Sequence, residues 1–268
     1  MSHITDSQYL RREQYQNSSN LSARIALHAR FSLNPQGWQH WVFDQLSLAP
    51  GSCVLELGCG SGTLWQENLE RLPPVGELVL SDFSNGMVAQ ARKNLAGRLT
   101  AARFQTFDAK AIPFPTASFD SVIANHMFYH VPKRDRALAE IRRVLKTNGR
   151  LYATTGGKQH MRELYELVQR FNTEVAADGW YLEPIDFTLE NGQAQLSEWF
   201  HTIELRRYID ALVVTEAAPL VDYILSSVRL SLGIKQRAGL SRYIQEQLDH
   251  NGGSIRISTD SGMFIACA

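Results

Sequence analysis

The stretch Val54-Leu-Glu-Leu-Gly-Cys-Gly-Ser-Gly62 places three closely spaced glycines directly behind a short apolar run. We predict a buried strand at Cys53–Leu57, because the turn pair Pro50-Gly51 precedes it and it is too apolar to have a solvent-exposed face. A helix expected over Thr63–Leu72 would offer free amide groups at its N-terminus, next to backbone that the glycines leave open. This strand, loop and helix together predict a site for a nucleotide-like ligand.

The residues around the glycines separate three kinds of ligand. A loop that grips nucleoside triphosphates needs Gly-Lys-Ser/Thr at its end, but here Thr63 follows Gly62. A dinucleotide-binding loop has the spacing Gly-x-Gly-x-x-Gly, whereas this loop has Gly-x-Gly-x-Gly, preceded by Glu56, which would repel a pyrophosphate. The acid suits a cationic group instead, such as the ammonium group of S-adenosylmethionine, which carries no phosphate.

Further carboxylates follow later strands of the predicted sheet. Asp82 ends a strand expected over Glu77–Ser81, where it could accept hydrogen bonds from ribose hydroxyls or cap the next helix. Asp108-Ala109 follows a strand expected over Phe104–Phe107 and could meet the edge of an adenine. A fourth strand at Phe119–Asn125 would end beside the methionine part of such a cofactor.

Taken in order with Leu145–Leu151, these motifs resemble those of class I S-adenosylmethionine-dependent methyltransferases over about residues 38 to 156, and most of all the ubiquinone/menaquinone-biosynthesis branch. One departure is Asn148, where the family commonly has proline, but Asn-Gly is itself a good turn pair. The resemblance implies S-adenosylmethionine as cofactor, S-adenosylhomocysteine as product, and a set of binding residues. These are Glu56, Gly58, Cys59, Gly60, Gly62, Asp82, Phe83, Met87, Asp108, Ala109 and Asn125.

The expected fold class is α/β. Alternating strands and helices, together with the resemblance, predict a Rossmann-like, seven-stranded, mostly parallel sheet with helices on both faces and an antiparallel last strand. The 268 residues contain no linker rich in Pro, Ser or Gly, so we expect a single domain, 1–268. Within it we expect an N-terminal helical cap (1–35), a cofactor-binding core (36–156) and a C-terminal half (157–268) with a helical insertion at about 215–253.

Composition limits the partners of this protein. Lys plus Arg and Asp plus Glu number 27 each, which argues against general attraction to nucleic acid, although scattered arginine pairs leave a local RNA-binding patch open. The chain has no apolar run of 18 residues and no secretory signal, so we expect a cytoplasmic protein without a membrane span. Its three cysteines lack metal-ligand spacing, and neither a zinc site nor a disulfide is expected.

The N-terminal segment is expected to lie across the open end of the sheet. Helices are predicted over Asp6–Tyr15 and Leu21–Ala29, and a third helix follows them with an apolar stripe of Trp38, Val42 and Leu46. In the methyltransferase family such a segment often closes over the cofactor. Candidates for the acceptor side are therefore Tyr15, Arg24 and His28, with Arg24 meeting the cofactor carboxylate; ordinary packing or surface roles are the alternative.

The C-terminal half is expected to complete the sheet. Arg150–Thr155 is the predicted fifth strand, and Ile203–Val214 and Ser254–Cys267 are the candidates for an antiparallel pair. Amphipathic helices are predicted from three stripes of apolar residues: Leu164, Val168, Phe171 and Val175; Leu220, Tyr223, Ile224 and Val228; and Leu240, Ile244 and Leu248. The insertion is a candidate substrate lid, with a dimer contact as the alternative.

Methyl transfer from a sulfonium ion is an in-line displacement, so the enzyme must mainly align the nucleophile and exclude water. A base helps where the acceptor is a hydroxyl or a protonated amine, and the candidates are His126 and His130, just after the fourth strand. The alternative for each histidine is a bond to the backbone. A metal pair is disfavoured, because no carboxylate or cysteine completes a ligand set. Tyr129 is a candidate for the pocket wall.

The sequence therefore predicts an enzyme that transfers a methyl group from S-adenosylmethionine to an oxygen, nitrogen or carbon nucleophile of a small molecule. The alternatives are an RNA-modifying methyltransferase, a non-catalytic cofactor-binding protein and, more remotely, a nicotinamide-dependent dehydrogenase. The acceptor and the oligomeric state, monomer or homodimer, do not follow from the sequence.

Overall fold

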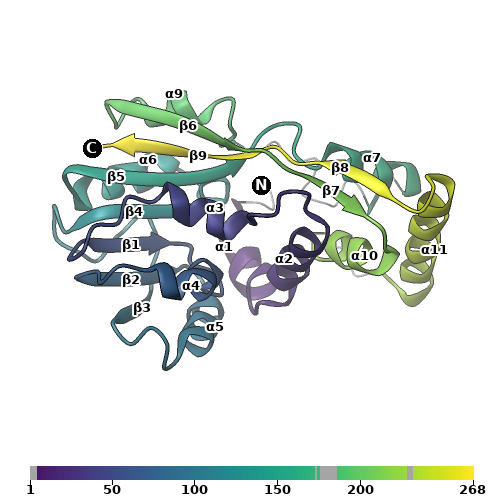
Figure 1. Ribbon diagram of the computed structural model, residues 1–268, viewed down its shortest axis with the longest axis horizontal. Coiled ribbons are helices and arrows are strands. Elements are labelled where there is room, and N and C mark those ends of the chain that lie inside the picture. The colour runs from purple at the N-terminus through teal and green to yellow at the C-terminus, as the bar shows by residue number, and fades with distance from the viewer. Residues whose placement is uncertain (1–4, 173, 176–185, 228–231) are drawn as a thin grey trace.

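A computed structural model describes residues 5–172, 174–175, 186–227 and 232–268. Its main sheet has seven strands in the order β3-β2-β1-β4-β5-β9-β6 (Figure 1). The strands are β1 (Cys53–Leu57), β2 (Glu77–Asp82), β3 (Ala102–Thr106), β4 (Phe119–Asn125), β5 (Leu145–Gly156), β6 (Thr202–Tyr208) and β9 (Ser261–Cys267). The first five run parallel, and β9 lies antiparallel between β5 and β6. The predicted fold class is confirmed.

Different helices cover the two faces of this sheet. Neighbouring strand residues point to opposite faces, so Val54 packs in one core and Leu55 in the other. The core around Val54 is completed by α3 (Trp38–Gln45), α4 (Thr63–Asn68) and α5 (Asn85–Leu95). The core around Leu55 is completed by α6 (Arg134–Val144) and α9 (Gly192–Leu196). Loops at the carboxyl ends of the strands are left to form a site.

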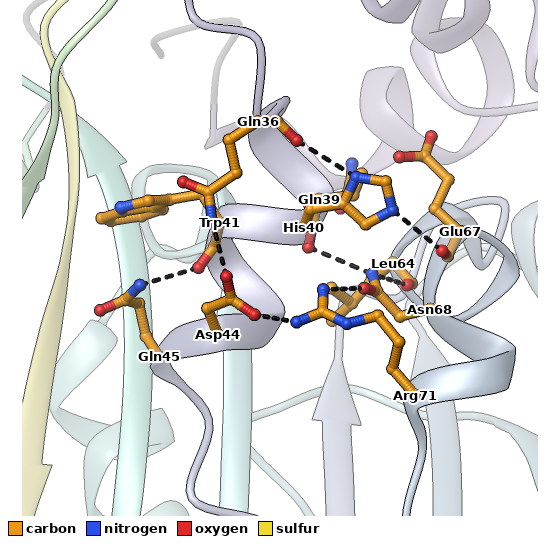
Figure 2. Close-up of polar contacts among 10 residues, drawn as sticks. All are labelled: Gln36, Gln39, His40, Trp41, Asp44, Gln45, Leu64, Glu67, Asn68 and Arg71. Atoms are coloured by element: carbon orange, nitrogen blue, oxygen red, sulfur yellow. Dashed lines mark hydrogen bonds and ion pairs between the residues drawn. The ribbon is translucent and has the colours of Figure 1, made fainter.

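Polar contacts attach α3 to α4 (Figure 2). The buried amide of Asn68 donates to the carbonyl oxygens of Leu64, 2.8 Å away, and Gln39, 3.2 Å away. Arg71, in the 3₁₀ turn Leu69–Arg71 after α4, forms an ion pair with Asp44 of α3. These contacts fix the orientation of α3, whose first residue, Trp38, faces the candidate site.

A second hydrophobic core lies beyond the end of the main sheet. It contains α2 (Ser19–Phe31), α7 (Arg162–Phe171), α10 (Ala217–Leu225), α11 (Ile234–His250) and a two-stranded sheet of β7 (Ala211–Val214) and β8 (Ile255–Ser258). Figure 1 shows α2, near the N-terminus, beside α10 of the insertion. The insertion therefore packs, together with α2 and α7, into a core separate from those on the two faces of the main sheet.

The expected antiparallel pair of Ile203–Val214 with Ser254–Cys267 is wrong in one respect. It is two pairs, β6–β9 in the main sheet and β7–β8 in the second sheet. The chain bends between them at Asp210, whose carboxylate accepts hydrogen bonds from the amides of Leu33 and Asn34, each 3.0 Å away. This contact with the end of α2 turns the ribbon out of the main sheet.

Several element boundaries differ from those predicted. The helix expected at Asp6–Tyr15 is a short helix α1 (Ser7–Tyr9) followed by a π-helical segment η2 (Leu10–Gln14). The helix expected at Thr63–Leu72 is α4 with its 3₁₀ turn. The third strand begins earlier than expected, at Ala102, and the fifth at Leu145, with Asn148 in the left-handed region at φ +65°.

Of the apolar residues assigned to helices, one lies outside the helix described for its stripe and another is not described. Val175 is buried in the second core but lies beyond the end of α7 at Phe171. Val228 lies outside the described residues. Within the described part of the chain, no helix combines the length and the apolar character needed to cross a membrane.

Candidate functional site

The loop between β1 and α4 keeps its backbone open. Gly58, Gly60 and Gly62 have φ angles of +69°, +54° and +78°, in the left-handed region that favours glycine. A Cβ atom on Gly58 would lie 3.0 Å from Met127 Cβ, and one on Gly60 would lie 3.1 Å from Leu21 Cδ2. The loop therefore passes close under α2 and the turn after β4, and it could not do so with larger residues.

Glu56, on β1 just before this loop, is buried without a cationic partner among its described contacts. Its Oε2 accepts a hydrogen bond from Trp65 Nε1 at 2.5 Å, and Oε1 accepts from Asn125 Nδ2 at 3.4 Å. Burial raises the pKa of Glu56 to about 7, although both hydrogen bonds oppose the shift. A bound cation would favour the carboxylate, so Glu56 is suited to an ammonium group.

Asp82, at the end of β2, holds the glycine loop from the side. Its Oδ2 accepts from the amide of Gly60 at 3.0 Å, and Oδ1 accepts from the amide of Ser84 at 2.8 Å. Burial raises the pKa of this carboxyl group, and the backbone hydrogen bonds oppose the shift. Ser84, rather than Asp82, caps α5, since its Oγ accepts from Met87 N at 3.3 Å.

The residues expected to bind the adenine are joined to one another by fewer described contacts than Glu56, the glycine loop and Asp82. Phe83 lies under the Arg11 guanidinium, 4.5 Å from the ring centroid, and Met87 is 1% exposed. The described polar contacts of the Asp108 side chain go to its neighbour Lys110, with Oδ1 2.9 Å from the amide and Oδ2 3.3 Å from Nζ. Asp108 is therefore not joined to Asp82 or Phe83 by these contacts.

Cys59 and Ala109 of the predicted set are both buried, at 7% and 8% exposure. The Cys59 amide donates to Ser81 O at 2.8 Å, which attaches the loop to β2. Burial raises the pKa of the Cys59 thiol well above its usual range. The Cys59 carbonyl accepts from the Gly62 amide at 2.9 Å, so both backbone groups of Cys59 are used to hold the loop in shape.

The turn after β4 carries the two histidines expected to act on the acceptor. His126 has φ +47°, and its amide donates to Thr154 Oγ1 at 2.9 Å. Its ring lies 5.1 Å from the Trp38 ring, centroid to centroid. Burial, and then the neighbouring His28, lower the pKa of His126 to about 4. His126 is therefore neutral and a weak base near neutral pH.

His130 meets the N-terminal segment. Its Nε2 lies 2.9 Å from the hydroxyl of Tyr15, and the Tyr129 ring lies 4.5 Å from its own, centroid to centroid. Burial raises the pKa of Tyr15, although the nearby Arg24 opposes the shift, so the phenol is protonated near neutral pH. Tyr15 and His130, 115 positions apart, form a hydrogen-bonded pair.

Arg24 and the insertion are also brought together. Arg24 donates from Nε to Ser226 Oγ at 3.1 Å and from Nη2 to Ser226 O at 2.6 Å, and Gln14 Nε2 donates to the same carbonyl at 3.2 Å. Arg24 thus joins α2 to the end of α10, and its expected contact with the cofactor carboxylate stays a prediction. The N-terminal segment and the insertion form one cover.

Sequence reasoning missed His160 and Tyr223. The His160 ring lies 6.3 Å from the His28 ring and within 3° of parallel, and Tyr223 of α10 lies 6.1 Å from His28, centroid to centroid. Burial, followed by His28 and His126, lowers the pKa of His160 to about 3. His160 follows the carboxyl end of β5, the sheet edge where ligands bind, and that position was a usable signal. Apart from its position in a predicted helix, no sequence signal marked Tyr223 as a site residue.

Among the described residues, no three His, Cys, Asp or Glu side chains are arranged to hold a metal ion. The residues that the structure does assemble come from both halves of the chain: Tyr15, Arg24, His28, Trp38, Glu56, Asp82, Asn125, His126, Tyr129, His130, His160 and Tyr223.

Comparisons with known proteins agree with this geometry. Residues 55–153 match the family model described as "Methyltransferase domain". The ubiquinone/menaquinone biosynthesis C-methyltransferase UbiE of Ralstonia pickettii (strain 12J) is 34% identical over 134 residues, which are 48% of this chain and 54% of that protein. The chain thus spans about half the length of the curated relatives it matches.

Two solved structures share the fold. The YcgJ protein of Bacillus subtilis has a TM-score of 0.59 and 18% identity, over 85% of this chain and 97% of that chain. Phosphoethanolamine N-methyltransferase 2 of Haemonchus contortus, in complex with S-adenosyl-L-methionine, has a TM-score of 0.61 and 19% identity, over 100% of this chain and 60% of that chain. At these identities the similarity is one of fold.

Proposed function

Because residues 55–153 form a class I S-adenosylmethionine-dependent methyltransferase domain, we propose that the protein methylates an oxygen, nitrogen or carbon nucleophile of a small molecule. The observation that carries the proposal is the arrangement of Glu56, the glycine loop and Asp82 at one edge of the sheet. Glu56 would bind the ammonium group of the cofactor and Asp82 its ribose, with the glycine loop between these two acids. The bound cofactor would supply an electrophilic methyl group.

The residues present fit this cofactor. A Cβ atom on Gly62 would lie 2.9 Å from Leu95 Cδ1, so glycine is needed for the loop to hold its close path. Buried Glu56 has no described cationic partner, and an ammonium group would provide one. Asp82 already accepts two amide hydrogen bonds and has further lone pairs for ribose hydroxyls.

We propose that His130 is the base and that Tyr15 relays the proton to it. The Tyr15 hydroxyl would take the proton of the acceptor nucleophile while it passes its own proton to Nε2 of His130, 2.9 Å away. His126 is a poorer base, since its pKa is lowered to about 4. It would instead orient the acceptor.

The cover formed by the N-terminal segment and the insertion would exclude water from the reacting groups. Arg24 and Gln14 both donate to Ser226 O, and Ser84 Oγ donates to the Tyr15 carbonyl at 2.7 Å. These contacts attach the cover to α10 on one side and to the cofactor side on the other. Opening of this cover would admit both ligands.

The remaining proposals concern the whole chain. We propose that residues 1–268 act as a single methyltransferase domain on a small molecule in the cytoplasm, as a monomer or a homodimer. Equal numbers of basic and acidic residues, 27 each, support a small-molecule acceptor over nucleic acid.

The test is a calorimetric titration with S-adenosylhomocysteine and, separately, with NAD, followed by a metabolite screen with labelled S-adenosylmethionine. We expect micromolar binding of S-adenosylhomocysteine alone and transfer of label to a small molecule. Binding without transfer to any metabolite would favour a non-catalytic cofactor-binding protein. Binding of NAD alone would refute the proposal.

A further inference from the structure

Three histidines from distant parts of the chain lie near the residues proposed to act on the acceptor: the rings of His28 and His160 are parallel, and the His126 ring lies 6.2 Å from that of Tyr129, the neighbour of His130. His28 comes from α2, His126 from the turn after β4 and His160 from the loop after β5. We call them the three-histidine cluster. His28 and His126, when charged, both lower the pKa of His160, and all three side chains are partly exposed. We infer the ligand of this cluster on the premise that the protein is a methyltransferase.

One hydrogen bond fixes the proton of His160. The amide of Asp260 donates to Nδ1 at 3.2 Å, and the Ser261 hydroxyl lies 3.4 Å from the same nitrogen. A backbone amide can only donate, so Nδ1 carries no proton and the neutral ring carries its proton on Nε2. His160 therefore presents an N–H donor on the side of the ring away from Asp260.

The charges around the cluster favour an anion. Groups near it come from the N-terminal segment and α2, the turn after β4, α10, the bend between β6 and β7, and the chain between β8 and β9. They are Tyr15, Arg24, Tyr129, His130, Tyr223, Asp210 and Asp260. Asp210 is committed to the amides of Leu33 and Asn34, and Asp260 to Arg207. No carboxylate among these groups is left for a cationic acceptor.

We propose that the three-histidine cluster binds an anionic oxygen group of the methyl acceptor, a carboxylate or a phosphate, and takes up one proton from solvent as it does so. His160 would donate from Nε2, and the imidazole that gains the proton would supply the positive charge. His28, whose ring lies parallel to that of His160 with the centroids 6.3 Å apart, is the imidazole that gains the proton. The nucleophilic end of the acceptor would then lie toward Tyr15 and the cofactor methyl group.

Proton uptake gives the binding a definite dependence on pH. In the free protein, burial lowers the pKa of His28 and lowers those of His126 and His160 to about 4 and about 3, so the imidazolium form of each is disfavoured. An anion stabilises the imidazolium, so its affinity should rise as the pH falls, by up to about tenfold per pH unit when one proton is taken up. A site that binds an anion through neutral donors alone would show no such slope.

The experiment uses the full chain saturated with S-adenosylhomocysteine, whose affinity is measured first. Acetate, which stays singly charged over this range, is titrated from about pH 8 to about pH 6 at constant ionic strength, with histidine ring nitrogens followed by NMR. On addition of acetate at a fixed pH, we expect the His28 signals to move toward imidazolium, while the signals of exposed His201 and His250 stay where they are. Inorganic phosphate in a parallel titration tells which anion binds more tightly.

His28→Gln keeps an N–H donor but cannot gain a proton, so it should abolish the pH dependence of acetate binding without changing the affinity for S-adenosylhomocysteine. His160→Gln also keeps an N–H donor but should retain the slope, because Nδ1 of His160 accepts from the Asp260 amide and is not the site of protonation. His250→Gln is the matched control. An unchanged pH slope in His28→Gln, or an unmoved His28 signal, would overturn the proposal. If the wild type did not bind S-adenosylhomocysteine, the proposed function would be refuted. The anion site could then still be tested, because acetate can be titrated into the free protein.

Discussion

The cofactor side and the acceptor side of this site are built in different ways. On the cofactor side, Glu56, Gly60 and Asp82 lie within two successive strand–loop units. The Gly60 amide donates to the Asp82 carboxylate, and the hydroxyl of Ser81, next to Asp82, donates to the Glu56 carbonyl. On the acceptor side, contacts such as Tyr15–His130 and Arg24–Ser226 join residues 115 and 202 positions apart. A cofactor shared by many enzymes is held by local backbone geometry, whereas an individual acceptor is met by side chains that only tertiary packing brings together.

The largest effect should come from the acceptor side. His130→Ala removes the proposed base, so turnover on the acceptor found by the label screen should fall by about 100- to 10,000-fold. Affinity for S-adenosylhomocysteine, measured by calorimetry, should stay unchanged, because His130 is proposed to act on the acceptor and not on the cofactor. Tyr15→Phe keeps the ring and removes the hydroxyl, and it should lower turnover as well. Wild-type turnover in both variants would leave alignment alone as the source of catalysis.

The next effect belongs to Glu56 on the cofactor side. Its folded pKa is raised from 4.5 to about 7, so the protonated form favours folding and that stability is fully present below about pH 4.5. As the pH rises through about 7, the free energy of unfolding should fall by up to about 3 kcal/mol. Glu56→Gln should remove this loss, which urea unfolding at several pH values would detect.

The same acid gives the opposite slope for binding. Below about pH 7 the ammonium group of S-adenosylhomocysteine meets a neutral Glu56, so affinity should rise with pH in the wild type and less so in Glu56→Gln. Equal slopes in both proteins would remove Glu56 from the ammonium site.

Asp82 tests whether local hydrogen bonds hold the cofactor. Asp82→Ala removes the ribose partner and frees the Gly60 amide, so affinity for S-adenosylhomocysteine should fall by about 30-fold. Asp120→Ala is the matched control: Asp120 accepts from the Cys53 amide at 2.8 Å and pairs with Lys146, but at the start of β1 and β4, the opposite edge of the sheet. It should lower stability without changing that affinity. Equal losses of affinity would mean a general loosening of the sheet.

The same difference explains what could be predicted from the sequence. The bounds of β1 and β4 were predicted correctly, because both strands are short, apolar and followed by clear turn or polar signals. His160 and Tyr223 were missed because their partner, His28, belongs to a helix that docks from the far end of the chain. The bend at Asp210 depends on the same docking, since its carboxylate binds backbone that follows α2. Local pattern carries no information about such pairings.

The smallest predicted effect concerns the cover. Arg24→Gln weakens the attachment of α2 to α10, because the charged fork that meets both oxygen atoms of Ser226 is lost. We expect opening of the cover to become easier by about 1 kcal/mol, with roughly fivefold faster dissociation of S-adenosylhomocysteine and faster amide exchange in α10. Stopped-flow measurements and hydrogen exchange would record the two changes.

Arg30→Gln is the control for this cover, because Arg30 lies on the same helix and pairs with Glu216, immediately before α10. Both side chains of that pair are about half exposed, at 56% and 45%, and an exposed ion pair contributes little. Arg30→Gln should therefore leave both rates near those of the wild type. If the two variants behaved alike, the half-buried hydrogen bonds of Arg24 would not hold the cover, and the apolar contacts of α2 in the second core would have to account for closure on their own.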